Sequence, residues 1–142
     1  MTAPLRRWQV ACATLLVMAS VTLAEAEQIS WQECPVGQKR VTCVVDGDTL
    51  WYQRTKIRLI GIDAPEVEGR CTAERVLANQ ATTYLTALLN TGLTRIAYDG
   101  VDRYGRSLAR LWVHHAEVGP AMIAAGLAEP YGSGRPAPWC HQ

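Results

Sequence analysis

The sequence predicts an α+β domain that is mainly β: a small five-stranded barrel with one long and one short helix, held by disulfides. Short alternating polar and apolar runs bounded by turn residues predict the strands. A longer stretch with apolar residues at three- and four-residue steps predicts the long helix. The chain has 142 residues, 49% hydrophobic and 19% charged, which suits one globular domain and argues against a disordered protein.

Residues 1–26 are predicted to be a signal peptide. Arg6 and Arg7 precede an apolar run, and the tripeptide Ala-Glu-Ala at 24–26 fits a cleavage site. An uncleaved membrane anchor is the alternative, but the run is short for a bilayer span of about 20 residues. We therefore expect an exported protein, periplasmic or secreted, whose mature domain is 27–142 and lies outside the membrane.

The mature domain is formally neutral. Arg6, Arg7 and Glu25 lie in the leader, so 12 of the 14 basic and 12 of the 13 acidic residues remain. A neutral domain excludes indiscriminate binding of polyanions. Any affinity for nucleic acid must come from a few placed charges, and binding should be weaker and more sensitive to salt than that of a comparable basic domain.

Four cysteines remain after the leader with Cys12 is removed, and they are predicted to form two disulfides. Zinc is the alternative, but the chain has no Cys-x-x-Cys or Cys/His pair with ligand spacing. Three pairings are possible. We favour Cys34–Cys43 together with Cys71–Cys140, and the second of these would fasten the C-terminal tail to the domain.

Three extended segments open the mature domain after a polar arm at 27–40. They are residues 41–46, rich in β-branched side chains, residues 49–52, and the alternating segment 56–62. Pro65 ends the third segment, because proline cannot donate to a ladder and its ring restricts the residue before it.

A helix and two more strands follow. Apolar spacing predicts a helix over 72–90, stopped at Thr91-Gly92, and then strands at 94–98 and 107–113. A short helix is expected over 118–128, and the last fourteen residues should form a tied-down tail. Three strands, a helix and two strands, in this order, suit a closed barrel of the OB type.

Four carboxylates lie at the predicted ends of two neighbouring strands. Asp46 and Asp48 belong to the sequence Asp-Gly-Asp-Thr, and Asp63 and Glu66 belong to Asp-Ala-Pro-Glu. Oxygen ligands converging from loops are what calcium requires. Taken separately, each pair also fits an ordinary solvated turn.

Arg58 lies at an alternating position of the strand that leads to Asp63. It could be an exposed strand residue paired with a carboxylate, or it could clamp a phosphate through two parallel hydrogen bonds. Carboxylates that hold a metal, next to arginines that hold an anion, favour phosphoryl transfer over glycoside or acyl chemistry. The metal would polarise the phosphate, the arginines would stabilise developing charge, and another carboxylate would activate water.

Three segments resemble the signature segments of staphylococcal-nuclease-like (thermonuclease) domains. They are VVDGDTL (44–50), IRLIGIDAPE (57–66) and DRYGRSLARLW (102–112), in the same order and spacing, within a resemblance that covers 41–128. It implies an OB-type barrel and a calcium-dependent phosphodiesterase. The expected substrates are single-stranded or loosened DNA and RNA, cut with little sequence specificity to leave 3′-phosphate and 5′-hydroxyl ends. We expect a monomer.

The resemblance also implies roles for individual residues. Asp48, Asp63 and the main-chain carbonyl of Ala64 would bind calcium, and Asp46 would lie near the metal without binding it directly. Glu66 would be the general base or the carboxylate that orients the attacking water.

Arginines supply the implied phosphate contacts. Arg58 and Arg106 would bind the scissile phosphate. Arg103 and Tyr104 would cradle the substrate phosphate and sugar, with an ordinary exposed turn as the alternative.

The chain departs from the family pattern in three places. The loop after Glu66 is short and carries Cys71, and Tyr131, a candidate for stacking on a base, follows a less basic stretch than usual. The family's final helix is missing, and we expect a disulfide from Cys140 to fasten this end instead.

Two other classes of function compete with the enzyme. One is a non-catalytic OB-fold module that binds nucleic acid or protein, and the other is an exported structural domain in which the charged set is an ion-pair network. The set is complete, comprising Asp48, Arg58, Asp63, Glu66 and Arg106, and this favours the enzyme.

Overall fold

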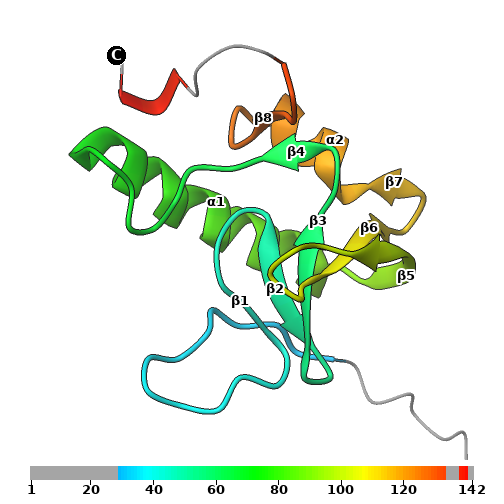
Figure 1. Cartoon of the computed structure of the whole chain (residues 1–142). Coiled ribbons are helices and arrows are strands. Elements are labelled where there is room, and N and C mark those ends of the chain that lie inside the picture. The colour runs from blue at the N-terminus through cyan, green and yellow to red at the C-terminus, as the bar shows by residue number, and fades with distance from the viewer. Residues whose placement is uncertain (1–28, 134–137, 141–142) are drawn as a thin grey trace, which may run out of the picture.

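The computed structural model describes residues 29–133 and 138–140, so the predicted leader lies outside the described residues. The elements are β1 (Cys43–Val44), β2 (Thr49–Tyr52), β3 (Thr55–Leu59), β4 (Ile62–Asp63), α1 (Thr72–Asn90), β5 (Leu93–Val101), β6 (Ser107–Val113), β7 (Ala116–Glu117), α2 (Val118–Ala124), β8 (Glu129–Pro130) and a 3₁₀ helix (Pro138–Cys140). The predicted mixed fold, mainly strands with one long and one short helix, is confirmed (Figure 1).

The main sheet has the strand order β1-β2-β3-β6-β5, with β7 added beside β6. All its pairs are antiparallel except β3 with β6, which are parallel. A parallel pair needs a crossover connection, and here α1 and β5 supply it. The register sets Arg58 beside Leu108. The last three residues of β3 therefore pair with the first three residues of β6, directly after the loop at 102–106.

The predicted strand 56–62 is wrong in one respect, because the structure divides it into β3 and β4. Gly61 takes a positive φ of 83°, a conformation that glycine adopts without steric cost and that turns the chain between the two strands. β4 then pairs with β8, a ladder that the sequence analysis did not predict.

The short helix α2 ends at Ala124, four residues before the predicted end at 128. Gly126 has a φ of 71° and donates its N–H to the carbonyl of Ile123, while Leu127 donates to Met122. These two bonds form a Schellman motif, which satisfies the last carbonyls of a helix and stops it.

The long helix α1 begins and ends where the sequence predicts. Its start is capped by Cys71, whose Sγ accepts the N–H of Glu74 at 3.4 Å. The helix runs beside the strands (Figure 1), and its apolar residues join those of the sheet and α2 in one core. Side chains buried in this core include Leu50, Ile57, Leu85, Leu89, Leu111 and Met122. Within the described ranges, no helix combines the length and apolar character needed to cross a membrane.

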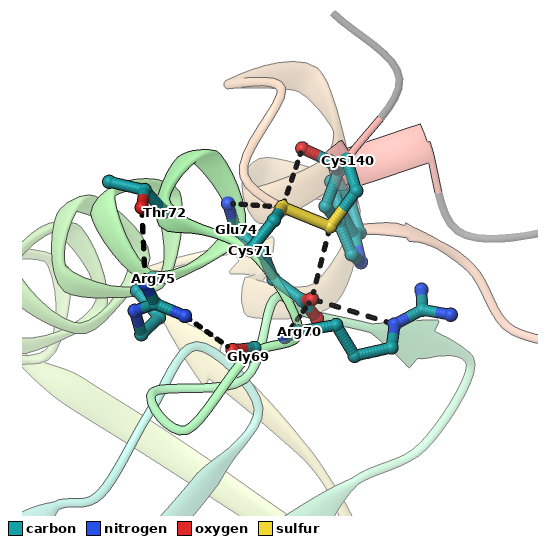
Figure 2. Close-up of a disulfide and its surroundings, with 8 residues drawn as sticks. Gly69, Arg70, Cys71, Thr72, Glu74, Arg75 and Cys140 are labelled. Atoms are coloured by element: carbon teal, nitrogen blue, oxygen red, sulfur yellow. Dashed lines mark hydrogen bonds and ion pairs between the residues drawn. A yellow bond between two sulfur atoms is a disulfide. The ribbon is translucent and has the colours of Figure 1, made fainter.

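Both favoured disulfides, Cys34–Cys43 and Cys71–Cys140, are present. The first joins the N-terminal arm to β1. The second joins the start of α1 to the C-terminal 3₁₀ helix across a sequence separation of 69 residues (Figure 2). The expected fastening of the C-terminal end is therefore confirmed, and the alternative of a zinc site built from these cysteines is not supported.

Truncating Leu85 should test the shared core. Leu85 is fully buried, so we expect Leu85→Ala to lower the free energy of unfolding by about 3 kcal/mol through lost burial and a cavity. Val76 lies on the same helix but is 51% exposed, and Val76→Ala should change stability by no more than about 0.5 kcal/mol. Urea unfolding at equilibrium measures both. Equal losses would show that the face of α1 bearing Leu85 is not a core face.

Candidate active site

The turn between β1 and β2 holds the first two carboxylates. Asp46 Oδ1 accepts the N–H of Asp48 at 3.1 Å, and both side chains are buried. Gly47 lies between them in close contact with the rest of the fold. A Cβ at Gly47 would lie 2.8 Å from the Cβ atoms of both Ala64 and Ala81. Glycine is required here because the turn packs directly against the segments that contain Ala64 and Ala81.

Asp48 joins this turn to the segment that carries the other carboxylates. Its Oδ2 accepts the N–H of Ala64 at 2.9 Å and pairs with Nη2 of Arg58 at 2.9 Å, while its Oδ1 accepts the hydroxyl of Thr49 at 2.9 Å. Burial raises the pKa of Asp48 to about 7, although Arg58 and both hydrogen bonds lower it and Asp46 raises it further. A second positive charge at this place would favour the ionised carboxylate.

Arg58 links Asp48 with Asp63. The Nη2 atom of Arg58 lies 3.2 Å from Oδ1 of Asp63, and its Nη1 donates to the carbonyls of Leu59 at 2.7 Å and Ile62 at 3.0 Å. Only 12% of the arginine side chain is exposed. Arg58 therefore pairs with carboxylates, as the interpretation of an ion-paired strand residue predicted, but its side chain is mostly buried. Arg58 also lines a neighbouring pocket, which the interpretation of a phosphate clamp requires.

Glu66 lies beyond β4 and is exposed to solvent. Partial burial raises its pKa above the ordinary value. The negative charges of Asp46, Asp63 and Glu74 raise it further, and Arg58 lowers it. Glu66 therefore lies within electrostatic range of the other site charges. An accessible carboxylate with a raised pKa is suited to accept a proton from water.

A tight turn before β6 carries Arg106, the second arginine expected to bind phosphate. Asp102 accepts the N–H groups of Tyr104 and Arg106 at 2.9 Å each, and its Oδ2 accepts from Nε of Arg106 at 2.7 Å. Burial would raise the pKa of Asp102, but the bonds from Arg106 and Tyr104 outweigh this and lower it. Asp102 was not predicted as a site residue from the sequence, although an aspartate at the start of a turn that contains glycine is a known turn signal.

A pocket of about 260 Å³ lies between Arg58 and the turn that carries Arg106. Its lining includes Arg58, Arg103, Tyr104, Arg106 and Tyr131. The structure thus brings together the expected phosphate-binding residues and the candidate stacking residue. The expected metal ligands do not line this pocket but lie beside it, connected through Arg58.

The position of Tyr131 depends on the ladder between β4 and β8. Its N–H donates to the carbonyl of Gly61 at 3.0 Å, which holds the residue after β8 next to the turn between β3 and β4. Tyr131 is 72% exposed and Tyr104 is 70% exposed, so both rings are accessible at the pocket.

A different group of possible metal ligands lies at the start of α1. Donor atoms of Cys71, Glu74 and Cys140 lie within 4.8 Å of one another (Figure 2). Both sulfurs belong to the same disulfide, and a disulfide does not supply the thiolate that binds metal. The oxidised protein therefore offers a single carboxylate here, and the carboxylates around Asp48 are the better site for a cation.

Comparison with known proteins gives the family. Residues 56–138 match the family described as "Staphylococcal nuclease homologue". The chain is 30% identical over 95 residues to a thermonuclease of Staphylococcus hyicus, covering 63% of this chain and 56% of that protein. It is 32% identical over 91 residues to the thermonuclease of Staphylococcus intermedius, covering 60% and 54%. The chain belongs to the staphylococcal nuclease homologue family, as its three signature segments indicated.

A protein of a different organism gives a similar match. The chain is 31% identical over 97 residues to an uncharacterised endonuclease of Haemophilus influenzae, covering 65% of this chain and 51% of that protein. The chain thus spans about half the length of the relatives that it matches.

Adding one methyl group at Gly47 should test the packing of the carboxylate turn. Gly47→Ala would place its Cβ against two other Cβ atoms, so we expect a loss of about 1–3 kcal/mol in the free energy of unfolding. The turn would also move away from Ala64, and affinity for divalent cations should fall at the same time. Urea unfolding and calorimetric titration measure the two effects. Unchanged values would show that the turn can shift freely.

Proposed function

We propose that this protein is an exported, calcium-dependent nuclease that hydrolyses DNA and RNA with little sequence specificity and leaves 3′-phosphate and 5′-hydroxyl ends. The observation that carries the proposal is the shared position of Arg58. Its guanidinium pairs with the carboxylates of Asp48 and Asp63 on one side and lines the arginine-rich pocket on the other. The residues that we propose to bind metal and phosphate are therefore adjacent, which suits metal-assisted phosphodiester hydrolysis.

The carboxylate group fits calcium in its chemistry. Asp48, Asp63 and the carbonyl of Ala64 are hard oxygen donors from two loops, and Asp46 adds negative charge behind them. The burial that raises the pKa of Asp48 also fits, because a cation would compensate its charge. When bound, calcium would polarise the phosphate and favour ionisation of a nearby water.

Protein side chains would perform the remaining steps. Glu66 would orient the attacking water and accept its proton. Arg58 and Arg106 would hold the non-bridging oxygens and stabilise the charge that develops on them. Asp102 would keep the Arg106 guanidinium in a fixed direction, because it bonds both the main chain and Nε of that residue.

The pocket favours single-stranded or loosened substrates. Tyr104 and Tyr131 present accessible rings beside Arg103 and Arg106, and base stacking on such rings requires unpaired bases. Stacking is tolerant of sequence because every base has an aromatic face. With a formally neutral domain, binding should depend on these few contacts and weaken with salt.

A non-catalytic binding module is the second candidate. Arg58 already bonds two carboxylates and two carbonyls, which is the arrangement expected of a structural ion-pair network. Such a module would bind oligonucleotides in the same pocket without cutting them.

Cleavage assays distinguish the two candidates. End-labelled single-stranded DNA and RNA should be cut in calcium and left intact in chelator. Glu66→Gln should lower the rate about 10²–10⁴-fold, as expected for a general base. Arg106→Ala should lower it by about 10²-fold or more.

The control is Arg95→Ala, which removes an arginine that lies over the ring of Trp112, outside the pocket lining, and should leave cleavage unchanged. Tight binding by a folded, calcium-loaded protein without cleavage would support the binding module.

Calcium binding should depend on pH through Asp48. Metal binding needs the ionised carboxylate, and its pKa is about 7 without metal. The apparent affinity should rise about tenfold per pH unit below this value and level off above it. Without metal, the raised pKa stabilises the fold fully below about pH 4, and this contribution is lost as the pH rises through about 7.

Calorimetric titrations between pH 5.5 and 8.5 measure the affinity, and chelated samples in urea measure the stability. Asp48→Asn should remove both dependences. Affinity that stays constant over this range would exclude Asp48 as a titrating ligand.

A further inference from the structure

We propose that Glu74 and the Cys71–Cys140 disulfide are positioning elements for Glu66, so that turnover depends on the oxidised state of this disulfide. The inference rests on the proposed function, because it assigns its effect to the carboxylate expected to activate water. It concerns the short loop between β4 and α1, which carries both Glu66 and Cys71.

The loop has a fixed conformation next to Glu66. The carbonyl of Glu66 accepts the N–H of Gly69 at 2.9 Å, which closes a turn over 66–69. The carbonyl of Gly69 accepts from Nη1 of Arg75 at 2.9 Å, a bond that ties the turn to the first turns of α1 (Figure 2). The backbone at Glu66 is therefore anchored to the start of the helix.

The Glu74 side chain packs against this turn and supports it. The side chain is 5% exposed, and its Oε2 accepts the N–H of Arg70 at 2.8 Å. A Cβ at Gly69 would lie 2.5 Å from Cγ of Glu74 and 2.8 Å from the carbonyl oxygen of Glu66. The turn thus rests directly on the Glu74 side chain, with no room for a larger residue at position 69.

The Cys71–Cys140 disulfide holds Glu74 in place. Sγ of Cys140 lies 3.6 Å from Oε2 of Glu74, and Sγ of Cys71 accepts the N–H of Glu74 at 3.4 Å (Figure 2). Trp139, next to the disulfide, is 4% exposed and lines a hollow with α1 residues. The C-terminal segment therefore covers the carboxylate that supports the Glu66 turn.

Reduction would remove this support. A dithiol reductant supplies two electrons and two protons, the bond between the two sulfurs breaks, and both cysteines become thiols while the reductant forms its own disulfide. Cys140 and Trp139 are then free to leave α1, which exposes Glu74 to water. The turn at 66–69 then loses the packing support of the Glu74 side chain, while Arg58, Arg106 and the pocket keep their own contacts.

The chain offers a matched pair of variants for the test. Cys34→Ser/Cys43→Ser keeps only the disulfide at Glu74, and Cys71→Ser/Cys140→Ser keeps only the disulfide of the N-terminal arm. Serine at position 71 still caps the helix, so α1 is retained. We expect dithiothreitol to lower kcat at least tenfold in the first variant, with KM within twofold. The second variant should already have the low kcat and should not respond.

A double-mutant comparison separates positioning from general loosening. In a Glu66→Gln background, removal of the Cys71–Cys140 disulfide should change the residual rate less than twofold, because its effect passes through Glu66. Glu74→Ala should reproduce the loss of kcat in the oxidised protein, while Glu74→Gln, which keeps the acceptor for Arg70, should restore most of the rate. A full loss in the Glu66→Gln background, or unchanged kcat in Cys71→Ser/Cys140→Ser, would overturn the inference.

Hydrogen exchange keeps the test independent of catalysis. Reduction of the first variant should speed amide exchange over 66–75 and leave 44–58 unchanged. If the wild-type protein cuts no substrate, the proposed function fails, and exchange alone then decides whether the disulfide holds this loop. Equal exchange over 66–75 before and after reduction would overturn the inference even in an active enzyme.

Discussion

The contacts of Arg58 hold the candidate site together. One guanidinium bonds a buried carboxylate from the turn before β2, a carboxylate at the end of β4 and two carbonyls between them. Without it, Asp48 would be a buried charge with no opposite charge bonded to it, and breaking such a pair costs about 3–5 kcal/mol. The same bonds fix the path of the chain through the turn at Gly61. The site and the local fold therefore depend on one interaction.

The parallel pairing of β3 with β6 places the rest of the site around Arg58. It aligns Arg58 with Leu108, and the turn that holds Arg106 precedes that position by a few residues. Asp102 then sets the direction of Arg106 within the turn. The carboxylates and the second arginine come from segments far apart in the sequence, and the sheet register brings Arg106 to the pocket that Arg58 lines, beside the carboxylates.

Local patterns in the sequence predicted much of the fold, but they did not predict all of the site. The helix over 72–90 was predictable because its apolar spacing is regular and its ends carry stop signals. The ladder between β4 and β8 was not predictable, because two-residue strands have no period, and the place of Tyr131 follows from that ladder. The need for glycine at position 47 depends on Ala64 and Ala81, whose approach is set by tertiary packing. The three signature segments located the charged residues, while their hydrogen bonds had to come from the structure.

The two disulfides fasten the N-terminal arm and the C-terminal segment to the rest of the described fold. The arm before β1 is joined through Cys34–Cys43, and Trp31 also exchanges two hydrogen bonds with Asn90 at the end of α1. The C-terminal segment is joined through Cys71–Cys140 and rests on the start of α1. One covalent bond thus does locally what a longer packed element would otherwise do, and its position next to Glu74 connects tail attachment with the loop of Glu66. If the protein is exported, as we propose, the oxidised bond is the stable state and the oxidising compartment would maintain this connection.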